Sequence, residues 1–166
     1  SFGCFFGVNN GELDVLVHLQ EISYSRINHP DEVFSIGQRH KLLVISVDRE
    51  KLVLKIANEA QRLGYCPELF IQVNTGNEFQ KAGITFEKLE NLFNLAKERY
   101  SLPVVGLMCL PPVSDSSLVH FKKLLRANKT LGLSRISMGM SSDFKNAIEL
   151  GSTDVRIGSA IFGSRG

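Results

Sequence analysis

The chain has 166 residues, of which 43% are hydrophobic, and this is enough to bury one core of ordinary domain size. Its 19 basic and 17 acidic residues are spread along the sequence, and the formal net charge of +2 argues against nucleic-acid binding or an anionic membrane surface. The three cysteines lie far apart and outside any CxxC pattern, so neither a disulfide framework nor a zinc site is expected, and a reducing compartment fits best.

Residues 1–41 carry the least regular pattern of the chain. The run DVLVHL (residues 14–19) predicts one strand, whereas His29-Pro30 breaks the segment that follows it. No apolar run reaches the roughly 20 residues that span a bilayer, and no basic segment precedes the apolar residues of the start. We therefore expect a soluble, cytoplasmic protein.

From residue 42 onward, short apolar runs alternate with segments of helical period. This alternation is typical of βαβ units and a parallel sheet. Because the runs are continuously apolar, they predict strands that are covered on both faces. The five runs are Leu42 to Val47, Leu69 to Val73, Val104 to Cys109, Ile136 to Met140 and Val155 to Phe162.

Four helices are predicted between these runs. The first follows Asp48, which is placed to accept hydrogen bonds from the first-turn amides, and stops at Gly64. The second begins after Thr85, the third spans 116–131, and the fourth begins near Ser142. Their expected buried stripes are Leu52, Val53, Ile56, Ala57, Ala60 and Leu63; Phe86, Leu89, Leu92, Phe93 and Ala96; Leu118, Phe121, Leu124 and Leu125; and Phe144, Ala147 and Ile148.

About six strand candidates in a parallel order predict a (β/α)8 TIM barrel. Such a barrel normally takes about 200 residues or more, so we expect it to be incomplete at the N-terminus, by one or two units. Since the sequence has no repeat, low-complexity tract or linker, one domain is predicted over residues 1–166.

Polar and glycine-rich residues end several of the predicted strands, where parallel α/β proteins bind their ligands. Ser137 offers a hydroxyl, Gly158 and Ser159 offer unshielded backbone N–H groups, and Arg156 adds a cation. Two neighbouring strand ends could therefore hold one phosphate. Taken singly, each glycine is better explained by a tight turn, and Ser142 by a helix cap. The turns do not need Ser137 or Arg156 at the same strand ends, which favours the phosphate site.

These motifs resemble the pyridoxal phosphate homeostasis family (YggS/PROSC), whose fold is that of the N-terminal domain of alanine racemase. The likeness covers roughly the last three-quarters of the chain, so residues 42–166 look family-like and residues 1–41 divergent. The matching segments are ISVDREKL (residues 45–52), FIQVNTGNEFQKAGI (70–84), GLMCLPP (106–112) and LSRISMGMSSDFKNAIELGSTDVRIGSAIFG (133–163).

The resemblance implies a single-domain, monomeric protein that binds pyridoxal 5′-phosphate (PLP) without established turnover and balances PLP and amino or keto acid pools. An arginine at the pyridine nitrogen would keep that nitrogen unprotonated and weaken the ring as an electron sink. The implied cofactor residues are Ser137, Gly158 and Ser159 at the phosphate, Arg156 at the pyridine nitrogen, and Asn74 and Met138 along the cavity.

The family's PLP-binding lysine, in an AVSK-type strand, has no counterpart in this sequence. Lys41 and Lys81 are expected to be solvated surface charges instead. Three explanations stay open, with the first favoured: the chain is a fragment of a protein that binds PLP normally, it binds PLP or a phosphate noncovalently, or it binds nothing.

A PLP-dependent racemase is the main enzymatic alternative, because fold alone does not decide function. Against it, this sequence has no second β domain, which in racemase relatives supplies a catalytic tyrosine. Of its tyrosines, Tyr65 and Tyr100 are expected at packing or surface positions, and Tyr24 lies in the stretch that does not align with the family. The four histidines show no HxH or HxxxH spacing, so no metal site is predicted.

Overall fold

The computed structural model describes residues 3–8, 13–18, 46–113, 115–158 and 161. The chain divides into two compact units, residues 1–42 together with 158–166, and residues 43–157. None of the helices among the described residues is long and apolar enough to cross a membrane.

The first unit contains an antiparallel pair of strands, β1 (Gly3–Val8) and β2 (Leu13–His18). The strand predicted over residues 14–19 is therefore present, but its partner is antiparallel rather than a parallel barrel strand. Strand β1 was not predicted, because GCFFGV is too short a run for its periodicity to be distinctive.

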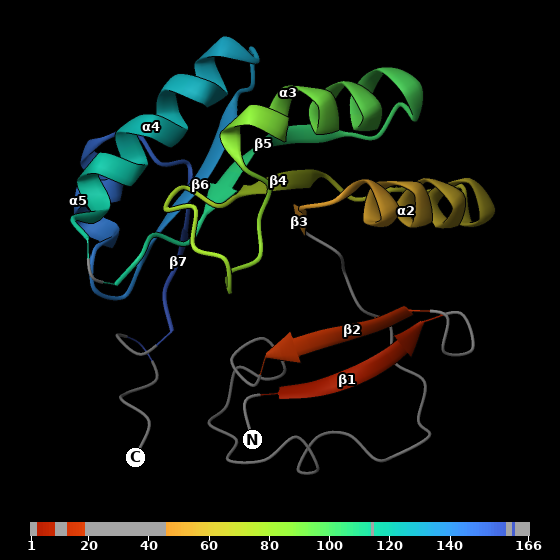
Figure 1. Ribbon diagram of the computed structural model, residues 1–166, viewed down its shortest axis with the longest axis horizontal. Coiled ribbons are helices and arrows are strands. Elements are labelled where there is room, and N and C mark those ends of the chain that lie inside the picture. Colours follow the sequence, from red (N-terminus) through yellow and green to blue (C-terminus); the bar gives the residue numbers. More distant parts are fainter. Residues whose placement is uncertain (1–2, 9–12, 19–45, 114, 159–160, 162–166) are drawn as a thin grey trace. The chain divides into compact units, whose positions relative to one another are not determined.

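The second unit is built on a five-stranded parallel sheet in the order β3-β4-β5-β6-β7. This order confirms the parallel α/β arrangement, with each strand beside the next one along the chain. Figure 1 shows α3 and α4 along the sheet, with α2 near the β3 end and α5 near the β7 end. The strands are β3 (Ser46–Val47), β4 (Leu69–Val73), β5 (Val104–Cys109), β6 (Arg135–Met140) and β7 (Asp154–Arg156).

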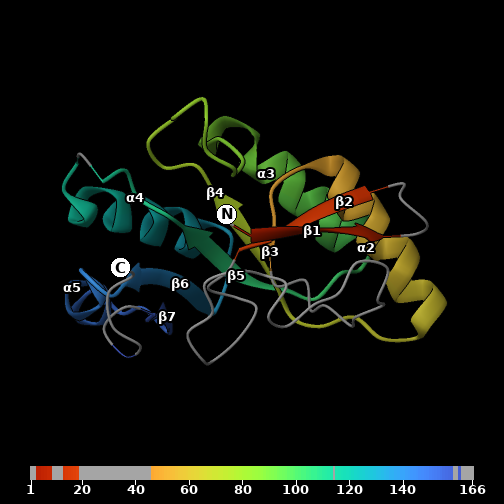
Figure 2. The same cartoon turned by 90° about the horizontal axis from the view of Figure 1, so that it is seen from below.

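Helices follow the strands and cover one face of the sheet. Their apolar residues and alternate strand residues form one core that includes Ile71, Leu107, Phe121 and Met138. Seen from below, α5 lies beside β6 and β7 (Figure 2). The helices are α2 (Glu50–Leu63), α3 (Phe86–Asn94) with its π-helical continuation η2 (Leu95–Arg99), α4 (Ser117–Thr130) and α5 (Phe144–Glu149).

Two predicted helix starts are wrong by one or two residues. Arg49, not Asp48, is the N-cap of α2, and no side chain caps that helix. The Asp48 carboxylate instead pairs with Arg49 and accepts a hydrogen bond from the Gly83 N–H at 3.3 Å. Asp143, not Ser142, precedes α5, and its carboxylate accepts from the Met140 N–H at 2.7 Å. In both places the carboxylate accepts a hydrogen bond from an amide outside the helix rather than from the first turn of the helix.

The buried stripe of α4 differs from the predicted one. Phe121 and Leu124 are fully buried as expected, but Leu118 is 39% exposed. Two polar residues that were not predicted to be buried, His120 and Asn128, are each only 4% exposed. Asn128 accepts from the Leu107 N–H at 3.0 Å and donates to the Leu133 carbonyl at 3.0 Å, so burial is offset by hydrogen bonds.

The last predicted strand is much shorter than its apolar run. β7 (Asp154–Arg156) ends at Arg156, so the run expected from Val155 to Phe162 contributes only its first two residues. Its pairing with β6 is irregular: Ser137 is opposite Asp154, but Met140 is opposite Arg156. β6 therefore advances three residues where β7 advances two, which is the count of a β-bulge on β6.

Candidate functional site

A cavity of about 560 Å³ lies within the second unit, on the sheet face that does not carry the core. Successive side chains of a strand point to opposite faces, so the residues that alternate with core positions face the cavity. The alternation explains why β4 is buried at every second residue rather than throughout, contrary to the prediction. The cavity is lined by Tyr65, Pro67, Glu68, Phe70, Met108, Arg135, Ser137, Asp154, Val155 and Arg156.

Two of the predicted site residues, Ser137 and Arg156, line this cavity. Ser137 is 6% exposed and lies opposite Met108 in the β5–β6 ladder. The hydroxyl of Ser137 can both donate and accept a hydrogen bond, so it offers either to a ligand in the cavity.

The guanidinium of Arg156 reaches across β6 to the end of β5. Its Nη2 donates to the Cys109 carbonyl at 2.6 Å, which holds the charge at the carboxyl end of the sheet. Burial raises the pKa of the neighbouring Cys109 thiol to about 12, and the positive charge of Arg156 lowers it only in part. The thiol is therefore neutral, and Arg156 has no thiolate beside it.

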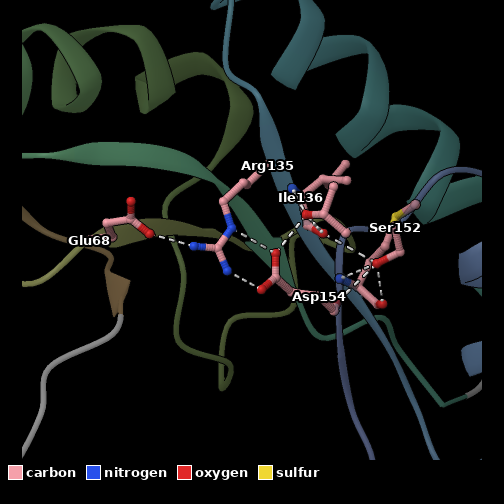
Figure 3. Close-up of polar contacts among 7 residues, drawn as sticks. Glu68, Arg135, Ile136, Ser152 and Asp154 are labelled. Carbon is pink, nitrogen blue, oxygen red and sulfur yellow. Dashed lines mark hydrogen bonds and ion pairs between the residues drawn. The ribbon is translucent and has the colours of Figure 1, made fainter.

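At the opposite end of the strands, Arg135 joins three elements. It pairs with Glu68 before β4 and with both oxygens of Asp154 on β7 (Figure 3). The Arg135 guanidinium also lies 5.1 Å from the Phe70 ring centroid. Burial raises the pKa of Asp154, but hydrogen bonds from Arg135 and Thr153 outweigh it and leave that pKa below its ordinary value. The charges of Arg135, Glu68 and Asp154 at this end of the cavity are therefore paired with one another.

Asn74 holds a loop in this structure. Its amide donates to the Glu78 carbonyl at 2.8 Å and accepts from the Glu78 N–H at 3.1 Å. Lys81, expected to be a solvated surface charge, is 31% exposed; its ammonium pairs with Glu78 and donates to the Pro111 carbonyl at 3.1 Å. These contacts join the loops after β4 and β5.

The remaining predicted site residues lie elsewhere. Met138 is fully buried in the hydrophobic core and does not line the cavity. Gly158 belongs to the first unit, where its carbonyl accepts from the Ile161 N–H at 2.9 Å. Ser159 lies outside the described residues. The convergence of Ser137 with the two backbone amides therefore stays a prediction.

Sequence reasoning missed the burial of one histidine on α4. His120 Nδ1 lies 3.2 Å from the Thr75 carbonyl, and Nε2 lies 3.3 Å from the Asp115 carboxylate. The helical spacing of His120 to Phe121, Leu124 and Asn128 is compatible with burial, but a polar residue in a stripe is hard to tell from a surface one. The described residues contain no group of three or more His, Cys, Asp or Glu that could hold a metal ion.

Comparison with known proteins identifies the family. Residues 5–166 match the model described as "Alanine racemase, N-terminal domain". A pyridoxal phosphate homeostasis protein of Pasteurella multocida is 32% identical over 93% of this chain and 76% of its own length. Another, from Aquifex aeolicus, is 37% identical over 75% of this chain and 58% of its own length.

Solved structures of PipY from Synechococcus elongatus share the fold. The form without PLP gives a TM-score of 0.65 at 28% identity, covering 70% of this chain and 59% of PipY. The form with PLP bound gives 0.64 at 26% identity, covering 73% of this chain and 60% of PipY. The chain spans between 55% and 60% of the length of the first five curated relatives that it matches. From the match over residues 5–166 and these relatives, the chain belongs to the pyridoxal phosphate homeostasis protein family, which has the fold of the alanine racemase N-terminal domain.

Proposed function

We propose that this chain binds PLP and serves PLP and amino or keto acid homeostasis, without turnover of its own. The observation that carries the proposal is the shared cavity of Ser137 and Arg156, two polar residues from neighbouring strands. Relatives named for PLP homeostasis and a PipY structure with PLP bound support the same ligand.

The cavity is large enough for a small molecule such as PLP, and its polar side chains suit the polar groups of PLP. Its volume of about 560 Å³ lies in the range of small-molecule sites, and it offers one hydroxyl and one guanidinium. In the proposed arrangement Ser137, Gly158 and Ser159 hold the phosphate and Arg156 faces the pyridine nitrogen. PLP, when bound, supplies an electron sink for amino-acid chemistry, and a guanidinium at its ring nitrogen weakens that property.

Covalent attachment through a lysine has no support among the described residues. No lysine lines the cavity, and Lys81 is engaged by Glu78 and the Pro111 carbonyl. We therefore propose noncovalent binding by the residues of this chain. The even mixture of charges and the free thiols of Cys66 and Cys109 support a cytoplasmic monomer that does not bind nucleic acid.

Equilibrium dialysis against PLP and against pyridoxal, which lacks the phosphate, tests the proposal. We expect PLP to bind at least about tenfold more tightly, because charge-assisted hydrogen bonds to a phosphate are lost with pyridoxal. Inorganic phosphate should compete with PLP, and borohydride treatment should attach no stoichiometric PLP to any one lysine, beyond scattered labelling of surface lysines. Equal affinity for the two compounds, or no binding of PLP, would contradict the proposal.

A further inference from the structure

The strand β7 carries Arg156, and side chains from the turn before it bind the adjoining edge of β6. The Thr153 hydroxyl accepts from the Ile136 N–H at 2.8 Å, and the Ser152 hydroxyl accepts from the Met138 N–H at 3.3 Å. Between Ser137 and Met140, the register of β6 against β7 is irregular. The two hydroxyls therefore support β6 where its pairing with β7 is irregular.

Ser152 lies at the centre of this network (Figure 3). Its hydroxyl is 2.8 Å from the Met138 carbonyl, 3.0 Å from the Asp154 carbonyl and 3.3 Å from the Ile136 carbonyl. A hydroxyl has one proton, so the shortest contact, to Met138, is the one it serves best. Ser152 thus both donates to and accepts from the backbone of Met138.

The irregular register decides where Arg156 lies relative to Ser137. In a regular ladder that begins with Ser137 opposite Asp154, Arg156 would lie opposite Gly139, whereas here it lies opposite Met140. The bulge moves Arg156 by one residue along β6, which is about 3.3 Å of strand. A shift of that size is comparable to a hydrogen-bond length, so it decides whether one ligand can meet both side chains.

We propose that Ser152 is a positioning residue for the ligand site: its hydroxyl holds the offset between β6 and β7 that brings Ser137 and Arg156 to one cavity. The inference rests on the proposed function for its ligand. Thr153 and Arg135 act on the same two strands through Asp154, the partner of Ser137 in the ladder. Ser152 contacts β6 within the irregular stretch itself, through both backbone polar groups of Met138.

The test compares Ser152→Ala with Ser152→Thr, which restores a hydroxyl, and with Asn128→Ala. The asparagine variant removes one hydrogen bond from α4 to β5 and one to the loop before β6, and so lowers stability without touching β7. Ser152→Cys keeps the side-chain volume with a weak donor, and it replaces Ser152→Ala in the comparison if the alanine variant does not fold.

The first readout needs no ligand. Amide hydrogen exchange of Met138 should be about tenfold faster in Ser152→Ala than in the unmodified chain, since the amide loses an acceptor. Exchange of Leu107 should stay unchanged in that variant and should speed up in Asn128→Ala instead.

The second readout is the dissociation constant for PLP by equilibrium dialysis. It should rise about fivefold in Ser152→Ala, recover in Ser152→Thr, and change less than about twofold in Asn128→Ala. Equal losses of affinity in Ser152→Ala and Asn128→Ala would reduce Ser152 to a general stabilising residue and overturn the inference. An unmodified chain that binds no PLP refutes the proposed function and the positioning role together. PLP binding by that chain, with Met138 exchange unaffected by Ser152→Ala, refutes the positioning role alone.

Discussion

Ser137 is the residue whose contribution to binding can be separated most cleanly from folding. Ser137 lines the cavity and is not part of the hydrophobic core, so Ser137→Ala removes little from the fold. We expect the variant to bind PLP about five- to tenfold more weakly, the loss of one charge-assisted hydrogen bond, with an unchanged unfolding temperature.

Ser116→Ala is the matched control for that change. Ser116 precedes α4, and its side chain makes no cap hydrogen bond, so this substitution also removes one hydroxyl. It should leave both PLP affinity and stability as they are. Unchanged affinity in Ser137→Ala, measured beside this control, would make Ser137 a structural residue.

The cysteines differ in reactivity because burial differs. Burial raises the pKa of Cys109 to about 12, and it also raises the pKa of the half-buried Cys66. At pH 8 a thiol of pKa 12 is ionised roughly a thousandfold less than an ordinary one, so iodoacetamide should modify Cys66 well before Cys109. Peptide mass spectrometry of the native Cys4→Ser protein, with a denatured sample as reference, measures both rates; faster labelling of Cys109 would contradict its burial.

Asp154 should make stability depend on acid pH. Its pKa is below the ordinary value in the folded chain, so its contribution is present above the unfolded pKa and is lost as the pH falls through the folded pKa. Denaturant unfolding between about pH 5 and pH 2 should show a smaller loss of stability in Asp154→Asn than in the unmodified chain. Thr153→Val removes one of the two hydrogen-bond donors and should fall between them. An identical loss of stability with falling pH in all three proteins would show that Asp154 does not cause the acid dependence.

At the scale of elements, the approach of α5 to β6 depends on Gly139. This residue has φ of +97°, and a Cβ built on it would lie 2.6 Å from the Ala147 Cβ and 3.0 Å from the Phe144 Cα. Gly139→Ala combines backbone strain with a clash against a helix, so we expect it to lower the free energy of unfolding by about 2 kcal/mol or more.

Gly132→Ala serves as the control for Gly139→Ala. Gly132 also has a positive φ, +65°, but nothing lies within 4 Å of the added Cβ, so only the strain contributes. Chemical denaturation of both variants should show the larger loss for Gly139→Ala. Equal losses would mean that α5 does not pack closely on the bulge.

Most elements of the second unit could be predicted from the sequence, but their ends and partners could not. The apolar spacing of Phe121 and Leu124 predicted α4, since a helix buries every third or fourth residue. The same spacing wrongly predicted that Leu118 is buried. Two polar residues that form hydrogen bonds, His120 and Asn128, are buried instead. The apolar run that begins at Val155 suggested a long strand, but β7 stops at Arg156. A run of apolar residues is compatible with a strand, a turn or a helix start.

Part of the candidate site was also accessible to sequence reasoning. Polar residues at the carboxyl ends of parallel strands indicated Ser137 and Arg156, and both line the cavity. The contacts of Ser152 were not foreseeable, because they arise from an irregular register that no local pattern encodes. The burial of Met138 and the loop contacts of Asn74 likewise depend on which face of the strand meets the helices.

At the scale of the whole molecule, the parallel α/β order and the family were predicted correctly. Both depend on long stretches of sequence, the strand and helix alternation of residues 46–156 and the motif around Met138, rather than on single residues. The pairing of β1 with β2 was not predicted, since strand partners are decided by tertiary contacts.

A crystal structure of the chain with PLP tests the central claim most directly, because it locates the phosphate. We expect phosphate oxygens about 3 Å from the Ser137 hydroxyl and from the backbone nitrogens of Gly158 and Ser159, and we expect the pyridine nitrogen to face Arg156. A phosphate bound away from Ser137, or a ring turned away from Arg156, would contradict it.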